Sequence, residues 1–196
     1  MIKAILTLLI SISFFVNVQG QEKKDLAISV SAGFLNSPYY NLAKPMGFYK
    51  IDFDYHLTSR HIIAANYLDG KHHYYDNTLS NDPTGSGYLD GTNSEAQYRT
   101  FSILYKYKIF DNTLFSIVPG VGAGVMTHTR EYPYKEVNAS YSRISSWSDL
   151  VFPVNVDINL KVYTRWQIGL TGGFLIHPDY PILGLHGGPK LSFVLP

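Results

Sequence analysis

The stretch that most constrains this chain is residues 150–162, LVFPVNVDINLKV. All of its even positions are apolar, whereas the odd positions from 155 onward carry amide or charged groups, namely Asn155, Asp157, Asn159 and Lys161. Successive side chains of a strand point to opposite faces, whereas a helix would spread these two sets around its circumference. We therefore predict a strand with one continuous apolar face. Its length suits the roughly 9–11 tilted residues with which a strand crosses a lipid bilayer.

The same alternation recurs along the chain and predicts eight strands in all. Alternation is poor only in the third, because Ile62 and Ile63 are adjacent, so its register is the least determined. The predicted strands cover residues 26–34, 48–57, 61–68, 98–109, 114–127, 150–162, 166–176 and 183–195.

The connections between these strands alternate between long and short. Tight turns are predicted at 58–60, 111–112 and 163–165, and polar loops at 35–46, 69–96 and 128–148, with a shorter loop around Pro178 and Pro181. An even number of strands, with short turns at one end and long loops at the other, is typical of outer-membrane barrels. The predicted fold class is therefore an all-β, transmembrane, antiparallel up-and-down barrel of eight strands.

The first twenty residues have the pattern of a secretory signal peptide, with Lys3, an apolar run and a small-residue end at Val18-Gln19-Gly20. The predicted division is thus a signal peptide at 1–20 and one barrel domain at 21–196. Lys3 is the only charge in the signal, so the remaining chain has equal numbers of acidic and basic residues, which argues against nucleic acid as a partner. The chain has no cysteine, which excludes disulfides and thiolate metal sites.

The chain resembles the small outer-membrane β-barrel family of Bacteroidota and, more distantly, OmpX- and OmpA-type eight-stranded barrels. The resemblance rests on the signal peptide ending before Gln21, the alternating strands, the glycine-rich segment 118–125 and the terminal strand GGPKLSFVL. It implies the outer membrane of a Gram-negative bacterium, with membrane lipid and the barrel assembly machinery as partners. One departure is the last residue, Pro196, where such barrels usually end on an aromatic residue; here the nearest is Phe193.

Charged side chains fall on the inward face of several predicted strands. A small barrel has an interior just wide enough for side chains to fill, so we predict an internal salt-bridge network in place of an ion path. Its members are Lys50, Asp52, Asp54, His56, Lys106, Lys108, Asp157, Lys161 and Lys190.

Glycine and proline mark further positions in the predicted strands. Gly120, Gly122 and Gly124 lack the final glycine and the helix of a dinucleotide fingerprint, so we expect them to make room for bulky lumen neighbours. Strand prolines cannot donate to a ladder and are expected at bulges or rims; they are Pro119, Pro153 and Pro189.

Aromatic side chains in the two longest predicted loops are the candidates for recognition. Tyrosine among Asn, Ser and Gly suits adaptable binding surfaces, although some of these rings can instead belong to the interfacial aromatic belt. The candidates are Tyr74, Tyr75, Tyr88, Tyr132, Tyr134 and Trp147. An extracellular protein or a secretion complex is the partner class that such loops would serve.

Two loop motifs suggest chemistry only weakly. His72-His73 with Asp76 could hold a metal or act on Ser80, and the segment 82–90 hints at calcium but has Asn93 where an EF-hand loop needs glutamate. Solvated loop residues are the better interpretation of both, so we predict no catalytic residue, no cofactor and no metal site.

Three function classes remain open from the sequence. The favoured one is a non-enzymatic barrel with an envelope-stabilising, adhesive or secretion-accessory role. The second is a lipid-modifying barrel such as a lipid A deacylase or acyltransferase, although His186 is followed by Gly187-Gly188 and not by the deacylase pattern His-x-Ser-Asn. The third is a soluble lipocalin-like carrier, which needs an apolar interior and a polar exterior.

Overall fold

The computed structural model describes residues 25–39, 43–76, 87–88, 92–136, 139–179 and 182–195. The predicted signal peptide lies outside these residues. Eight long strands form the fold, with their side chains described except at 75–76, 92–93, 132–136 and 139–143. They are β1 (Leu26–Asn36), β2 (Lys44–His56), β3 (His61–Asp76), β5 (Thr92–Tyr107), β7 (Phe115–Glu136), β8 (Ala139–Lys161), β9 (Trp166–Ile176) and β10 (Gly184–Leu195).

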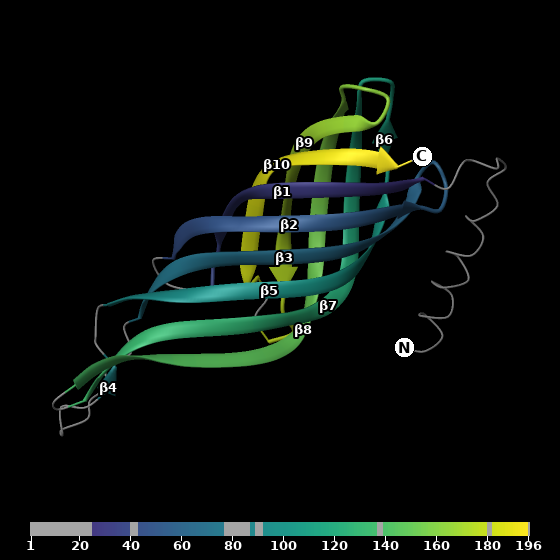
Figure 1. The fold of residues 1–196 in the computed structure, drawn as a ribbon. Helices are drawn as coiled ribbons and strands as arrows, with labels where there is room; N and C mark the ends of the chain where they lie inside the picture. Colours follow the sequence, from purple (N-terminus) through teal and green to yellow (C-terminus); the bar gives the residue numbers. More distant parts are fainter. Residues whose placement is uncertain are drawn as a thin grey trace, which may run out of the picture.

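The eight strands close into one antiparallel barrel (Figure 1). Each pairs with the next along the chain, and β1 pairs with β10 in a register that places Leu26 opposite Leu195. The start of β1 and the end of β10 therefore lie at one end of the barrel, the end that also carries the short turns. Two-residue strands β4 (Gly87–Tyr88) and β6 (Phe110–Asp111) add to β7. Within the described part of the chain, no helix is long and apolar enough to cross a membrane.

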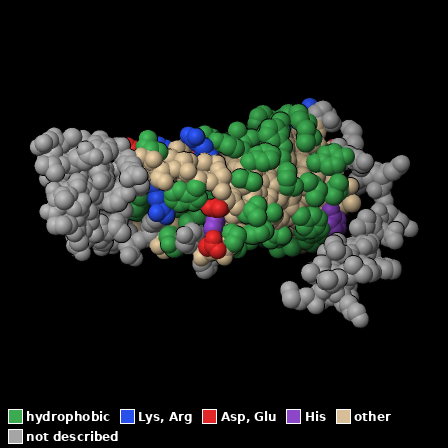
Figure 2. All heavy atoms as spheres, turned by 90° about the horizontal axis from the view of Figure 1, so that it is seen from below, with side chains coloured by type: hydrophobic (Ala, Val, Ile, Leu, Met, Phe, Trp, Pro, Cys, Tyr) green, Lys and Arg blue, Asp and Glu red, His purple; other side chains and the backbone are tan. Residues whose placement is uncertain are grey.

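The outer wall is apolar and the lumen is polar, as the alternation predicts. On β8, Val156 is 43% exposed, whereas its neighbour Asp157 is 1% exposed. The same division resolves the third strand, because Ile62 is buried on the inner face and Ile63 is exposed on the outer face. We call the ring of exposed apolar side chains around the wall the apolar band; Figure 2 shows such side chains gathered over the barrel wall.

The predicted loops 69–96 and 128–148 are wrong over much of their length, because strand structure continues through them. β3 pairs with β5 as far as Asp76 and Thr92, and β7 pairs with β8 without a change of register as far as Glu136 and Ala139. The polar residues of these segments include Thr, Tyr and Trp, which fit a pleated surface well. In water a strand can be polar on its outer face, so polarity alone did not distinguish strand from loop. Similarly, β1 extends to Asn36 and β2 begins at Lys44, inside the predicted loop 35–46.

We call the parts of β3, β5, β7 and β8 beyond the apolar band the extension, comprising residues 69–76, 92–99, 127–136 and 139–149. They project past the rest of the barrel at the lower left of Figure 1. They lie at the end opposite to the short turns.

The three strand prolines differ in how the ladder accommodates them. Pro119 lies where β7 changes its partner from β5 to β6, with a register shift of one residue. At Pro153 the β7–β8 ladder is interrupted, and at Pro189 the β1–β10 ladder is interrupted, but neither register changes. The prediction of bulges or rim positions is therefore wrong for Pro153 and Pro189. Proline has no N–H, so ladder hydrogen bonds are lost at these positions, but no extra residue is inserted and no bulge forms.

Glycines allow close approach of strand backbones next to one of these interruptions. A Cβ on Gly188 would lie 2.0 Å from the Ala32 carbonyl oxygen, and one on Gly33 would lie 2.2 Å from that of Gly187. Gly122 and Gly124 approach β5 in the same way, whereas a Cβ on Gly120 would meet the Lys106 side chain. Among the three glycines of β7, only Gly120 therefore makes room for a bulky lumen neighbour. Gly122 and Gly124 are required because the β5 backbone lies so close to them.

Candidate functional site

A cluster of three lysines and three aspartates fills the middle of the lumen. Asp157 lies at its centre, with carboxylate oxygens 2.7 Å from Lys190 Nζ, 3.1 Å from Lys106 Nζ and 3.9 Å from Lys50 Nζ. Lys106 also pairs with Asp54 at 2.9 Å and with Asp52 at 3.6 Å. The six charges cancel, so the buried cluster is neutral.

Neutral polar side chains complete the coordination of these charges. Lys50 Nζ donates to Thr171 Oγ1 at 2.9 Å, and that hydroxyl donates to Asp157 at 2.6 Å. Asn66 donates to Asp52 at 2.7 Å. Buried charges are tolerated when they are paired and hydrogen-bonded in this way. The charged side chains of the lumen are therefore held in place by each other and by these neutral groups.

Three of the predicted network residues lie outside this cluster, at the end with the short turns. Lys161 pairs with Asp111 at 2.6 Å, and Lys108 approaches the same carboxylate at 3.7 Å. His56 lines a small cavity of about 30 Å³ at this end, together with Lys108 and Lys161. That volume is close to the share of one water molecule.

Above the charged cluster, toward the extension, the lumen is apolar. This layer was missed from the sequence, although its residues occupy inward positions of the alternation. The described side chains that form it are Leu35, Phe48, Leu68, Tyr98, Met126, Val151, Leu175 and Leu183. Each of these residues is at most 4% exposed, so apolar side chains close the barrel on this side.

The two layers fill the described lumen with ion pairs and with apolar side chains. A lipocalin-like carrier needs an apolar interior and a polar exterior, and this barrel has buried ion pairs inside and Val156, Ile158 and Leu160 exposed outside. That alternative is therefore wrong.

A row of rings crosses the inner face of the extension at the boundary of the apolar layer, and Tyr98 belongs to both. Tyr98, His128 and Trp147 come from β5, β7 and β8 and are register neighbours. Ring centroids are 4.7 Å apart for Tyr98 and His128, and 4.3 Å apart for His128 and Trp147. His72 of β3 lies 5.1 Å from Tyr98, and the Arg130 guanidinium lies 4.9 Å from the Trp147 ring.

Both histidines of this row are held neutral. Burial, and then the Arg130 charge, lower the pKa of His72 to about 4 and that of His128 to about 3. Desolvation disfavours the charged imidazolium, and a nearby cation adds to this effect. The rings thus act as packing groups that join four strands where the extension leaves the barrel.

Of the six candidate recognition residues, only Tyr74 and Trp147 have side chains in the described part of the structure. Tyr74 is 4% exposed on the inner face of β3, so its assignment to an exposed loop is wrong. Trp147 is half-buried on the inner face of β8. Tyr75, Tyr132 and Tyr134 lie on strands, and Tyr88 pairs with Tyr134 through β4 and β7, but these four side chains lie outside the described part of the structure.

The outer face of the extension is polar and internally paired. Asp69 accepts hydrogen bonds from Tyr49 Oη at 3.0 Å, Gln97 Nε2 at 2.7 Å and Arg99 Nε at 3.3 Å. On β7 and β8, hydroxyl groups pair across the strands, Thr127 with Ser148 at 3.0 Å and Thr129 with Ser146 at 3.1 Å. This face is therefore suited to water, in contrast to the apolar band directly beside it.

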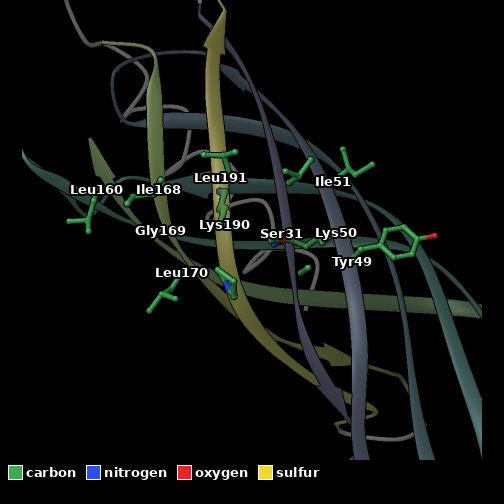
Figure 3. Close-up of a pocket in the computed structure, with 13 residues that line it drawn as sticks. Ser31, Tyr49, Lys50, Ile51, Leu160, Ile168, Gly169, Leu170, Lys190 and Leu191 are labelled. Atoms are coloured by element: carbon green, nitrogen blue, oxygen red, sulfur yellow. The ribbon is translucent and has the colours of Figure 1, made fainter. Parts of the chain in front are cut away.

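A shallow apolar depression of about 830 Å³ crosses the outer wall over β1, β2, β9 and β10. Its small lining residues include Ala32, Gly169 and Pro189. Larger side chains such as Tyr49, Leu170 and Leu191 border it (Figure 3). It lies within the apolar band.

The two histidines of the first weak motif do not face the same side of their strand. His72 and His73 are adjacent on a strand, so His72 is buried inside and His73 lies on the outer face, which prevents both from ligating one ion. Among the described residues, no three His, Asp or Glu side chains could together hold a metal ion. Ser80 and the segment 82–86 lie outside the described residues, as do Asp90 and the side chain of Asp76. His186 faces the lumen and contacts Phe48 at a centroid distance of 5.3 Å.

Comparisons with known proteins support the architecture. The sequence matches no protein-family model and no curated protein. The structure is similar to that of the outer membrane protein OprG from Pseudomonas aeruginosa, with a TM-score of 0.58, 10% identity, and coverage of 89% of this chain and 99% of that chain. It is also similar to Ail, the attachment invasion locus protein of Yersinia pestis, in complex with the heparin analogue sucrose octasulfate. That match has a TM-score of 0.54 and 11% identity, and covers 88% of this chain and 100% of that one. The chain thus has the fold of small outer-membrane barrels.

Proposed function

We propose that this protein is a non-enzymatic outer-membrane barrel that presents the extension at the cell surface for recognition of another molecule. The observation that carries the proposal is the contrast between the two parts of the same strands. Inside the apolar band the lumen is closed by ion pairs and hydrocarbon, and beyond the band the strands continue with a polar outer face.

The outer wall supports a membrane location. Exposed Val, Leu, Ile and Phe side chains surround the barrel, and in water such a continuous surface would be an aggregation liability. Over the closed part of the barrel, each strand pairs with a neighbour on both sides, which is what hydrocarbon demands of a spanning structure. Membrane lipid is thus the first partner, and insertion by the barrel assembly machinery is part of the proposal.

Recognition is assigned to the extension because the barrel wall has no surface to offer an external partner. Lipid covers the outside of the wall, and its inside is packed. Binding residues gather on segments that a rigid scaffold holds in place, and the ring row of Tyr98, His128 and Trp147 anchors the extension to such a scaffold. An adhesive role, or a role as a component of a secretion assembly, fits this arrangement better than an envelope-stabilising role alone.

The test removes the β7–β8 part of the extension without disturbing the barrel. Met126 and Asp149 are register partners, so replacing residues 127–148 with Asn-Gly gives a two-residue hairpin at the edge of the apolar band. The shortened protein should still fractionate with the outer membrane and keep the shift in gel mobility on heating. It should lose the binding of cells or surface proteins that the full-length protein confers.

Two outcomes would contradict the proposal. Failure of the full-length protein to fractionate with the outer membrane would remove the membrane assignment. Unchanged surface binding by the shortened barrel would move the function to the wall or to the short turns.

A further inference from the structure

Pro189 of β10 leaves one backbone carbonyl of β1 without its ladder hydrogen bond. Val194 donates its N–H to Arg165, so even residues of β10 bond to β9 and odd residues bond to β1. Pro189 is odd, and the constant β1–β10 register places it opposite Ala32. Because proline has no N–H, the carbonyl oxygen of Ala32 receives no ladder hydrogen bond from β10.

Pro153 of β8 has the same effect on β7 at another place in the wall. Lys161 donates its N–H to Leu114, so odd residues of β8 bond to β7. The register places Pro153 opposite Gly122, whose carbonyl oxygen therefore also lacks its ladder hydrogen bond. The two carbonyls are chemically alike, and they differ in their surroundings.

The Ala32 carbonyl lies at the apolar depression of the outer wall. Ala32 and Pro189 both line this depression, whereas Gly122 and Pro153 do not. Figure 3 shows Tyr49 of β2 on one side of it and side chains of β8 and β9 on the other. The side chain of Ala32 is a single methyl group, so few side-chain atoms cover the backbone between these borders.

The surroundings of Ala32 hold no water to replace the missing donor. Val30 and Phe34, its neighbours on the outer face of β1, are 49% and 70% exposed, so Ala32 lies within the apolar band. Hydrocarbon offers no water to an unpaired backbone group, and leaving such a group unsatisfied is costly. A donor carried by the lipid itself would remove this cost.

The upper border of the depression indicates how deep that donor must lie. Tyr49 is the register partner of Ala32 on β2, and its Oη donates to Asp69 at 3.0 Å, where the extension begins. Ala32 therefore lies one tyrosine side chain below the polar boundary of the wall. A lipid headgroup at this boundary would place the first carbons of its acyl chain beside Ala32.

We propose that the depression binds a membrane lipid whose acyl chain carries a hydroxyl group a few carbons from the headgroup, and that this hydroxyl donates to the Ala32 carbonyl oxygen. The depression is continuous with the lipid-covered apolar band, so an acyl chain reaches it without leaving the membrane. A plain chain would fill the same space but leave the carbonyl unpaired. The inference goes beyond the proposed function, because it concerns the wall and shares with that function only the membrane location.

The test measures the carbonyl carbon-13 resonance of Ala32 by NMR, with the full-length protein in lipid nanodiscs. One set of discs contains phosphatidylethanolamine with myristoyl chains, and the other contains the same lipid with β-hydroxymyristoyl chains. A hydrogen bond moves a carbonyl resonance downfield, so Ala32 should shift in the hydroxylated discs. The Gly122 carbonyl in the same sample should shift far less, because it lacks the depression.

The strength of one hydrogen bond sets the size of the expected preference. A net hydrogen bond of ordinary strength favours the hydroxylated chain over the plain chain by about threefold to tenfold. In discs with equal amounts of the two lipids, the Ala32 shift should therefore reach about three-quarters or more of its value in fully hydroxylated discs.

Three substitutions separate the hydroxyl contact from general contact with lipid. Pro189→Ala supplies the missing N–H to Ala32, so this carbonyl should give the same resonance in both lipids. Pro153→Ala is the matched control, because it supplies an N–H to Gly122 and leaves the depression unchanged, and Ala32 should then respond as in the wild type. Ala32→Leu fills the depression and should abolish the response of the carbonyl at this position.

The same Ala32 resonance in both lipids, or an equal shift at Gly122, would overturn the inference. A full response in Pro189→Ala would also overturn it, and if that variant does not assemble, a response retained by Ala32→Leu does so instead. A shift in plain discs that appears only when two copies share a disc would make a second copy the occupant and contradict the lipid site. Surface binding by the shortened barrel is a separate measurement, so failure here leaves the proposed function standing.

Discussion

At the scale of single residues, Asp157 has a role that its position in an alternating strand does not reveal. It is within 4 Å of three lysine amines and accepts from the Thr171 hydroxyl. From the sequence, Val156→Arg on the lipid face is expected to be far worse than Asp157→Asn beside it. The cluster geometry corrects that expectation, because loss of the central carboxylate leaves a net positive charge in a closed lumen.

We expect Asp157→Asn to lower the free energy of unfolding by about 3–5 kcal/mol, the usual cost of breaking a buried ion pair. Val156→Arg should cost about 2–4 kcal/mol if the residue lies near the bilayer midplane. The matched control is Lys161→Gln, which breaks a partly exposed pair at the rim and should cost at most about 1 kcal/mol. Urea unfolding in lipid vesicles measures all three. Equal stability of Asp157→Asn and Lys161→Gln would show that the cluster does not hold the lumen together.

The two neutral histidines make the extension sensitive to acid. Their folded-state pKa values, about 4 for His72 and about 3 for His128, lie below the ordinary value of 6.5. Below pH 6.5 the unfolded extension binds protons that the folded one does not. Stability of the extension is therefore complete above pH 6.5 and falls progressively as the pH drops toward 4 and 3.

Trp147 fluorescence measures this loss once the other tryptophan is removed by Trp166→Phe. We expect unfolding of the extension at low pH to precede loss of the barrel. The double change His72→Phe with His128→Phe should remove the pH dependence, and an unchanged acid transition in that variant would assign it to other groups.

At the scale of strands, two neighbouring glycines of β10 have opposite structural roles. A Cβ on Gly188 would meet the backbone of β1 at 2.0 Å, whereas a Cβ on Gly187 would lie 3.7 Å from the nearest atom, the Thr171 carbonyl oxygen. Gly188 is therefore required where β10 pairs with β1 to close the barrel, whereas a side chain at Gly187 would not obstruct this closure.

Gly188→Ala should therefore strongly reduce the heat-modifiable, closed form of the barrel, because the last strand can no longer approach the first. Gly187→Ala should leave closure intact and stabilise the barrel by about 0.5–1 kcal/mol, since alanine restricts the unfolded chain more than glycine does. The fraction of the fast-migrating form on an unheated gel measures both. Equal loss in the two variants would show that the seam does not depend on the close approach at Gly188.

The strands also show how far sequence patterns reach. Alternation located all eight strands and the inward sets of all but the third, because lipid and lumen impose a strong contrast on neighbouring positions. It failed where that contrast ends. Segments such as 128–136 remain in the ladder of β7 and β8, but water on the outer face removes the apolar signal.

At the scale of the whole molecule, the filled lumen predicts the absence of porin-like conduction. The charged cluster around Asp157 and the apolar layer around Leu68 and Tyr98 block the same bore in series. Reconstituted protein should give no large, steady single-channel currents in planar bilayers. A truncation such as Tyr98→Ala together with Met126→Ala should not open the bore, because the charged cluster remains. Steady currents from the wild type would contradict the closed lumen.

The sequence by itself determined the number of strands, the faces of the wall and the end at which the short turns lie. These depend on the alternation of neighbours, which is a property of the local chain. Only the tertiary structure decided the partners of Asp157, since Lys50, Lys106 and Lys190 come from three other strands. It also decided how far β8 runs past β9, because β9 pairs with β8 only over Phe152–Lys161. β9 ends at Ile176, opposite Phe152, and this end point has a meaning only when β9 is paired with the longer β8.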